Sequence, residues 1–343
     1  MEQKHELDLS ASCEHPQATK SQQLILNLLG NHAHPDIGYL SNLTEDEVNK
    51  AHHNAALTCS SLFGLFKPNF KSELVNKLLV CVAWGKQDEV EKLLKTSPEL
   101  MLEKTTFTDC SGRTFSNISA FEFVLWALDT RYMVNMMFNC LPKDEIGLKL
   151  ATKLEEQYYH HQEHGVTYTL EGQIITEKHF NSLVLTEALQ TYVDNFGNWT
   201  ELQRVAHWCK VVGKAQCYVP AHVMQHYCEP YVPFNPLPKF EAGQFIRTLK
   251  FYNFVNNQDM TWQGVTSSSD LVLGEDFGIL RGESGPGVGL AGWARVRAGV
   301  DVMAVSTLCK VRLADYLAIP SMLASLFDKK AAAEESPNSC LIS

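Results

Sequence analysis

The prolines of residues 229–240, EPYVPFNPLPKF, constrain the fold of this chain more than any other feature. Pro230, Pro233, Pro236 and Pro238 recur every two or three residues. Proline lacks a backbone N–H and its ring clashes with the preceding helical turn, so this spacing is incompatible with a helix. We therefore expect an extended connector over residues 230–238 that divides the 343-residue chain.

Before the connector, apolar residues recur with the spacing of amphipathic helices, which predicts a helical domain over residues 21–229. Within it, residues 71–102 predict two helices that are broken at Gly85. Residues 165–180 alternate between apolar and polar positions and contain Gly172, which predicts a short β-hairpin. The expected fold class is therefore mainly α.

After the connector, short segments with strand character precede residues 300–327, which predict two helices, the second beginning near Pro320. We expect a smaller α+β unit over residues 239–327. Residues 1–20 and 328–343 are polar and charged and bury little surface, which predicts a mobile leader and a disordered tail. The leader lacks the apolar region of a secretory signal peptide, and no apolar run reaches the ~18 to 20 residues of a spanning helix.

Composition narrows the classes of function. A formal net charge of −10 argues against a broad nucleic-acid surface, which needs clustered lysine and arginine. The ten cysteines are scattered, as expected for reduced thiols in a cytosol. A G-x-G-x-x-G motif at Gly287, Gly289 and Gly292 follows a loop sequence instead of a strand, so no dinucleotide and no other cofactor is expected.

The last four residues form a possible lipidation signal. Cys340, Leu341, Ile342 and Ser343 match the C-a-a-X prenylation motif, and a final serine favours farnesyl. The predicted tail would let this cysteine enter a prenyltransferase. A single lipid chain binds membranes only marginally, so a protein contact at the membrane would have to strengthen the anchor. The alternative is a cysteine placed there by chance.

Residues 207–228 hold a second cluster of reactive side chains. His222 and His226 are four residues apart and share one face of a helix, as zinc ligands do, and Cys228 or Cys209 would complete the site. The cysteine spacings match no standard zinc module. We expect a packed core with buried thiols here, and no metal.

The same block also permits a Cys–His enzyme. Cys217 or Cys209 would be the nucleophile, His222 or His207 the base, and Asp194 the residue that orients the base. No cysteine is marked as activated by its sequence context. A further pair, His160 and His164 beside Glu163, lacks the H-E-x-x-H frame and is interpreted as solvated surface.

Residues 70–140 resemble two degenerate ankyrin repeats. Ala83 and Gly85 stand at the turn between two helices, and Val90, Leu93 and Leu94 form the apolar face of the second helix. The alternative is a set of helical hairpins unrelated to ankyrin, because no T-P-L-H sequence is present.

The next unit would open at a D-x-x-G-x-T turn that contains Asp109, Gly112 and Thr114. Ankyrin-type surfaces bind partners with their turn tips and first helices. The resemblance therefore implies that Phe107, Asp109 and Arg113 contact a protein partner.

The same segment, taken with the polar tail and its glutamates Glu334 and Glu335, resembles effectors of Legionella and related intracellular bacteria. Those proteins enter eukaryotic cells through the Dot/Icm type IV system, and some end in a C-a-a-X box that host prenyltransferases modify. The resemblance implies secretion into a host cell, host proteins as partners, and a location in the host cytoplasm or on a host membrane. It assigns no catalytic residue. The alternatives are a Cys–His enzyme that modifies a host protein and a bacterial cytosolic protein with a fortuitous C-terminal motif.

Overall fold

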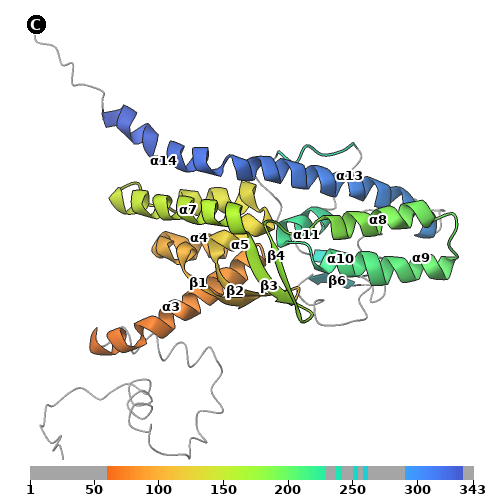
Figure 1. Ribbon diagram of the computed structural model, residues 1–343, viewed down its shortest axis with the longest axis horizontal. Coiled ribbons are helices and arrows are strands. Elements are labelled where there is room, and N and C mark those ends of the chain that lie inside the picture. Colours follow the sequence, from red (N-terminus) through yellow and green to blue (C-terminus); the bar gives the residue numbers. More distant parts are fainter. Residues whose placement is uncertain (1–59, 229–235, 242–249, 254–257, 262–289, 335–343) are drawn as a thin grey trace, which may run out of the picture. The chain divides into compact units, whose positions relative to one another are not determined.

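The computed structural model describes residues 60–228, 236–241, 250–253, 258–261 and 290–334 (Figure 1). Helices contain 68% of the described residues, which confirms the prediction of a mainly helical fold. The chain divides into two units, Met1–Glu73 and Leu74–Ser343, and all the described core residues lie in the second. The predicted leader, the start of the proline connector, the glycine motif up to Gly289 and the lipidation signal lie outside the described residues.

The elements follow one another in an order that mixes helices with short strands. The longer helices are α3 (Ser60–Ala83), α4 (Gln87–Thr96), α5 (Ala120–Ala127), α7 (Glu145–His164), α8 (Leu183–Asn195), α11 (Ala221–Cys228), α13 (Leu290–Leu317) and α14 (Ile319–Glu334). The shorter helical segments are η2 (Pro98–Leu102), η3 (Thr130–Val134), α6 (Asn135–Asn139), α9 (Glu201–His207), η4 (Trp208–Val212) and α10 (Gly213–Cys217). The strands are β1 (Lys104–Thr108), β2 (Thr114–Ser119), β3 (Val166–Leu170), β4 (Gln173–Glu177), β5 (Lys250–Asn253) and β6 (Gln258–Thr261).

The predicted helical pair is confirmed by α3 and α4, which meet at Gly85. This glycine has φ +65°, a conformation that side chains rarely adopt, and its N–H donates to the carbonyl of Val82. A Cβ atom at this position would also come within 2.7 Å of the amide nitrogen of Gln225. The turn therefore favours glycine for its backbone conformation, and any other residue would also displace the end of the Gln225 side chain.

The region after α4 differs from the expected repeat. Residues 98–119 form a 3₁₀ turn and the β1–β2 hairpin, so strands interrupt the stretch in which two repeats were expected. The D-x-x-G-x-T sequence is the hairpin turn: the Asp109 carboxylate accepts hydrogen bonds from the backbone N–H groups of Ser111 and Arg113. The ankyrin resemblance stays a prediction.

The strands β1 to β4 form one antiparallel sheet in the order β1-β2-β3-β4. The β3–β4 hairpin that the sequence predicts is confirmed. Its two turn residues, Glu171 and Gly172, both have positive φ, which matches the right-handed twist of the flanking strands. β5 and β6 form a separate antiparallel pair.

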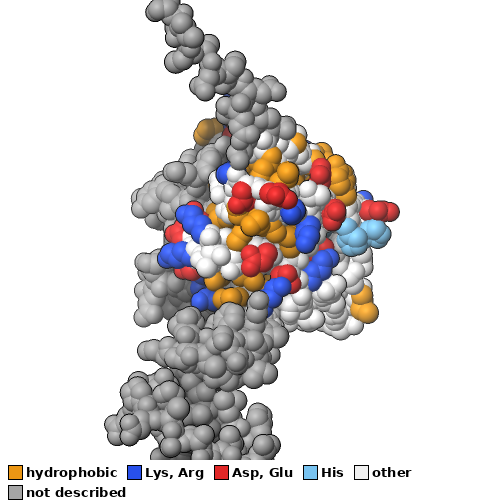
Figure 2. Space-filling view, turned by 90° about the vertical axis from the view of Figure 1, so that its left-hand side faces the viewer, with side chains coloured by type: hydrophobic (Ala, Val, Ile, Leu, Met, Phe, Trp, Pro, Cys, Tyr) orange, Lys and Arg blue, Asp and Glu red, His pale blue; other side chains and the backbone are white. Residues whose placement is uncertain are grey.

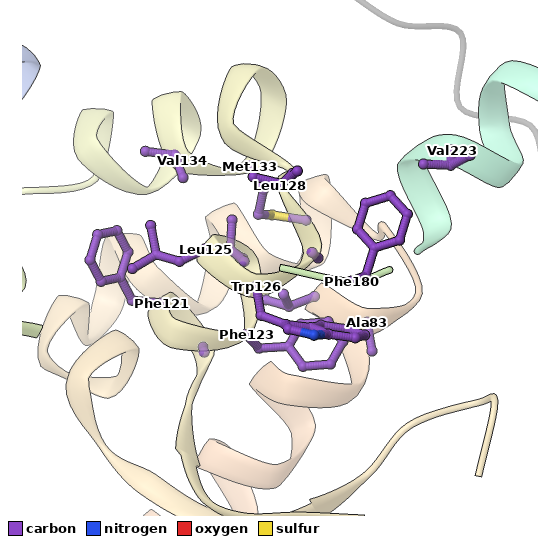
Figure 3. Close-up of a cluster of buried hydrophobic side chains, with 14 of the residues drawn as sticks. Ala83, Phe121, Phe123, Leu125, Trp126, Leu128, Met133, Val134, Phe180 and Val223 are labelled. Atoms are coloured by element: carbon purple, nitrogen blue, oxygen red, sulfur yellow. The ribbon is translucent and has the colours of Figure 1, made fainter. Parts of the chain in front are cut away.

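The core forms around α5, all eight residues of which are buried. Phe115 of β2 places its ring centroid 4.9 Å from that of Trp126 and 5.1 Å from that of Tyr168, which joins α5 to the sheet. Figure 3 shows side chains of α5 gathered with those of later segments, including Phe180 and Val223. Replacing a buried aromatic residue of this kind with alanine costs about 3–5 kcal/mol.

The two helices expected after residue 300 are confirmed as the second part of α13 and as α14. Figure 1 shows them beside α8 and α7, and their buried residues belong to the same core as those of α5. Among the described residues, the helices of the predicted unit 239–327 pack against elements that precede the proline connector. α14 runs to Glu334, beyond the expected start of the tail at residue 328.

Candidate functional site

The three residues expected to contact a partner are buried. Phe107, Asp109 and Arg113 expose 6%, 8% and 6% of their surface. Phe107 lies against Phe123, with ring centroids 5.8 Å apart. These three side chains therefore pack inside the fold, and the prediction that they contact a partner stays a prediction.

Arg113 is held by aromatic rings and carbonyl groups. Its guanidinium carbon lies 5.2 Å from the ring centroid of Trp126, 5.5 Å from that of Tyr168 and 5.2 Å from that of Tyr218. It donates to the carbonyl of Tyr218 at 2.8 Å and to the carboxylate of Asp109 at 3.4 Å. Burial raises the pKa of Asp109 and the arginine opposes that rise. This pair joins the β1–β2 turn to the end of α10.

Of the two proposed thiol nucleophiles, Cys217 has the side chain that the structure describes, and burial disfavours its thiolate. Burial raises the pKa of Cys217 to about 11, whereas a catalytic thiol has a lowered pKa. The proposed base, His222, is buried and its Nε2 lies 2.7 Å from the carbonyl oxygen of Ala127. Burial also lowers the pKa of this histidine, although Asp129 opposes the shift.

The other catalytic candidates make hydrogen bonds that do not involve a thiol. Nε2 of His207 lies 2.8 Å from the carbonyl oxygen of Ala188. Asp194 is exposed on α8 and accepts a hydrogen bond from Gln190. The side chain of Cys209 is not described. The described residues thus place both candidate bases against backbone carbonyls.

The proposed metal ligands are only partly described by the structure. His222 and His226 are both buried on α11, and the side chain of Cys228 lies outside the described set. Among the described residues, no three His, Cys, Asp or Glu side chains are arranged to hold a metal ion. His160 and His164 are exposed on α7, with stacked rings 4.6 Å apart, as the surface interpretation expected.

A surface groove is the candidate site that the sequence did not predict. It has a volume of about 570 Å³, within the range of ligand pockets. One wall is α7 and the other consists of η2, the start of β1 and the start of α5. We call it the α7 groove, and its lining residues are Glu99, Leu102, Glu103, Lys104, Glu122, Leu150, Lys153, Glu156, Gln157 and His160.

The base of the α7 groove is held by internal hydrogen bonds. Glu122 and Ser119 form a reciprocal capping box at the start of α5. Glu122 also accepts a hydrogen bond from Lys104 at 2.5 Å. Gln157 of α7 donates to the carbonyl of Leu102 and accepts from the hydroxyl of Ser119, both at 2.9 Å, which fixes the two walls to each other.

The rim of the groove carries charges that have no ion-pair partner among the described residues. These are Glu99 on η2 and Lys153 and Glu156 on α7. Lys153, Glu156, Gln157 and His160 are three or four residues apart, so they share one face of the helix. This spacing, together with the S-x-x-E capping signature at residues 119–122, was the available sequence signal. Figure 2 shows one face of the molecule on which acidic and basic side chains lie among hydrophobic ones.

None of the described helices is long and apolar enough to cross a membrane.

The chain is similar to a known domain and to a bacterial protein. The model of the CBUA0006 C-terminal domain matches residues 184–323. The uncharacterized protein CBUA0006 of Coxiella burnetii (strain RSA 493 / Nine Mile phase I) is 38% identical over 267 residues, which cover 73% of this chain and 75% of the relative. No solved structure matches. The chain therefore belongs to the CBUA0006 family.

Proposed function

We propose that this chain is an effector that enters a eukaryotic cell, binds host proteins there, and is held at a host membrane by prenylation of Cys340. The observation that carries the proposal is the terminal tetrapeptide Cys340-Leu341-Ile342-Ser343. The similar protein CBUA0006 comes from Coxiella burnetii. This bacterium is related to those that use Dot/Icm systems, and the sequence resembles the effectors of such bacteria.

Binding is favoured over catalysis by the state of the described thiols. Burial is the largest influence on Cys81, Cys110, Cys140, Cys217 and Cys309, and it raises the pKa of each. For Cys110 the pKa rises to about 12. Thiols in this state are poor nucleophiles at neutral pH.

The ankyrin-type part of the proposal is limited to one hairpin. α3 and α4, joined at Gly85, have the helix–turn–helix form of such a unit. The following β1–β2 hairpin would then be an insertion before the next helices. Under this proposal the partner surface is formed by exposed residues, not by the buried Asp109 and Arg113.

The anchor is tested by expressing the chain in a eukaryotic cell with an N-terminal fluorescent protein. We expect the wild-type chain on membranes and Cys340→Ser diffuse in the cytosol. Cys13→Ser, which removes a cysteine near the other end, serves as the control and should behave as wild type. Ser343→Leu should change the attached group from farnesyl to geranylgeranyl, since the last residue selects the transferase.

Intact-mass measurement tests whether Cys340 carries a prenyl group and whether the modification requires Cys340 to be the fourth residue from the end. The proposal requires a mass that corresponds to prenylated Cys340, and one glycine added after Ser343 should abolish the modification. An unmodified mass in transfected cells, with identical distributions of wild type and Cys340→Ser, would contradict the proposal.

A further inference from the structure

We propose that the α7 groove binds the long basic side chain, arginine or lysine, of an extended segment of a partner protein. This inference specifies the partner chemistry for the host-protein binding proposed above. It does not depend on lipidation of Cys340, so the two fail separately.

The groove suits a side chain that is apolar along its stem and charged at its tip. Leu102 and Leu150 supply apolar surface within it. Arginine and lysine bury their methylene groups against such surface while their charged groups stay at a polar rim. A short acidic side chain would bring the wrong charge and too little apolar area.

The charges of the groove favour a cation. The lining contains four glutamates against two lysines. Lys104 is paired with Glu122, whose side chain exposes 6% of its surface, so this lysine offsets a carboxylate at the base and leaves the rim acidic. Glu99 and Glu156 stand on opposite walls, where a guanidinium or ammonium group would meet carboxylates from both sides.

The groove is also preformed. Gln157 connects α7 to η2 and to the start of α5 through two hydrogen bonds of 2.9 Å. A site whose walls are already fixed loses little conformational entropy on binding. The long α7 helix and the capping box therefore hold a ready-made receptor for one side chain.

The test selects ligands from a phage-displayed library of random dodecapeptides with the purified full-length chain. Parallel selections use the variant Glu99→Gln/Glu156→Gln. The matched control is Glu187→Gln/Asp194→Asn, which removes two exposed charges from α8. We expect peptides selected by the wild type to be enriched in arginine or lysine. Their affinity should fall by at least about tenfold for the groove variant and stay unchanged for the control.

A second measurement separates a specific contact from general attraction to an acidic protein. Each selected peptide is remade with citrulline in place of arginine, which keeps the shape and removes the charge. Citrulline should weaken binding to the wild type and have little further effect on the groove variant. Selected peptides without basic residues, or equal losses in both double variants, would overturn the proposal. So would a dimer in solution that the groove variant dissociates, because a second copy would then be the occupant.

Discussion

At the scale of single residues, His161 of α7 makes the folded state sensitive to acid. Its side chain is fully buried, and its Nδ1 lies 3.1 Å from the hydroxyl oxygen of Tyr316 on α13. Burial, followed by the neighbouring His179, lowers the pKa of His161 to about 3 from its ordinary value of 6.5. The folded protein therefore excludes a proton that the unfolded chain accepts.

This difference predicts that the free energy of unfolding falls as the pH drops below 6.5. Between pH 6.5 and 3 the unfolded state binds the proton and the folded state does not, so stability is full above this window and is lost on acidification. The expected loss from pH 7 to pH 5 is about 2 kcal/mol, since one pKa unit corresponds to ~1.4 kcal/mol. Urea denaturation at both pH values measures it.

The variant His161→Gln should reduce this dependence on pH, because glutamine keeps polar groups near Tyr316 without titrating. His164→Gln, an exposed position on the same helix, is the control and should leave the dependence as in the wild type. An unchanged slope in His161→Gln would show that the acid sensitivity arises elsewhere.

Arg113 shows why residue identity alone did not predict burial. A charged residue beside a turn is exposed in most proteins, and the sequence around Asp109 gave no sign of burial. The rings that accept the guanidinium come from α5, β3 and the end of α10, at Trp126, Tyr168 and Tyr218. These residues lie up to about a hundred positions apart in the sequence, so no local sequence pattern predicts their contacts.

At the scale of elements, Gly165 and Gly172 differ in how closely the surrounding chain approaches them. Substituting each one therefore measures how closely the end of α7 packs against β4. Gly165 ends α7 with φ +68°, and a Cβ atom there would lie 2.5 Å from the carbonyl oxygen of Glu177. Gly172, in the hairpin turn, has φ +78° and no heavy atom within 4 Å of such a Cβ. Both positions carry backbone strain for alanine, but only the first adds a steric clash.

We expect Gly172→Ala to lower the free energy of unfolding by about 1–2 kcal/mol, the cost of a left-handed conformation. Gly165→Ala should cost about 1–3 kcal/mol more, because Glu177 has little freedom to move away. Its carboxylate accepts hydrogen bonds from Trp126 and Tyr168, both at 2.9 Å. Urea denaturation of both variants measures the difference, and equal losses would contradict the close approach.

The sequence predicted the elements that have a regular spacing of apolar residues or a characteristic turn sequence. The helices around Gly85 and the hairpin of residues 166–177 satisfy local rules that need no tertiary information. β1, with the sequence KTTFT, contains a single apolar residue, Phe107, and its strand conformation depends on pairing with β2. The sequence contains the helical spacing of one wall of the α7 groove, but not the groove itself, because η2 and α7 meet only in the folded chain.

At the scale of the whole molecule, the matched C-terminal domain shares its core with the preceding residues. The family match begins at residue 184, within α8. Across that boundary, Arg131 makes two hydrogen bonds to the carboxylate of Asp315, at 2.9 and 2.7 Å. Thr130 also donates to the carbonyl of Arg312, whose buried guanidinium bonds to the Tyr132 hydroxyl at 3.2 Å. One side of α13 therefore depends on η3.

We therefore predict that residues 184–343 expressed alone do not fold cooperatively. Without η3 and α7, the buried Arg312 loses its aromatic and hydroxyl contacts with Tyr132, and the apolar side of α13 and α14 is exposed to water. A hydrogen bond to a charged group contributes about 1.5–3 kcal/mol, and lost apolar burial adds to this, against the ~5–15 kcal/mol that stabilises a domain. The fragment should bind ANS and show a broad thermal transition, whereas the full-length chain should show a sharp one.

A longer fragment that also contains residues 74–183 should restore the sharp transition, because these residues supply η3, α5 and α7. A sharp transition in the isolated fragment would mean that residues 184–343 fold independently and that the shared core contributes little to their stability.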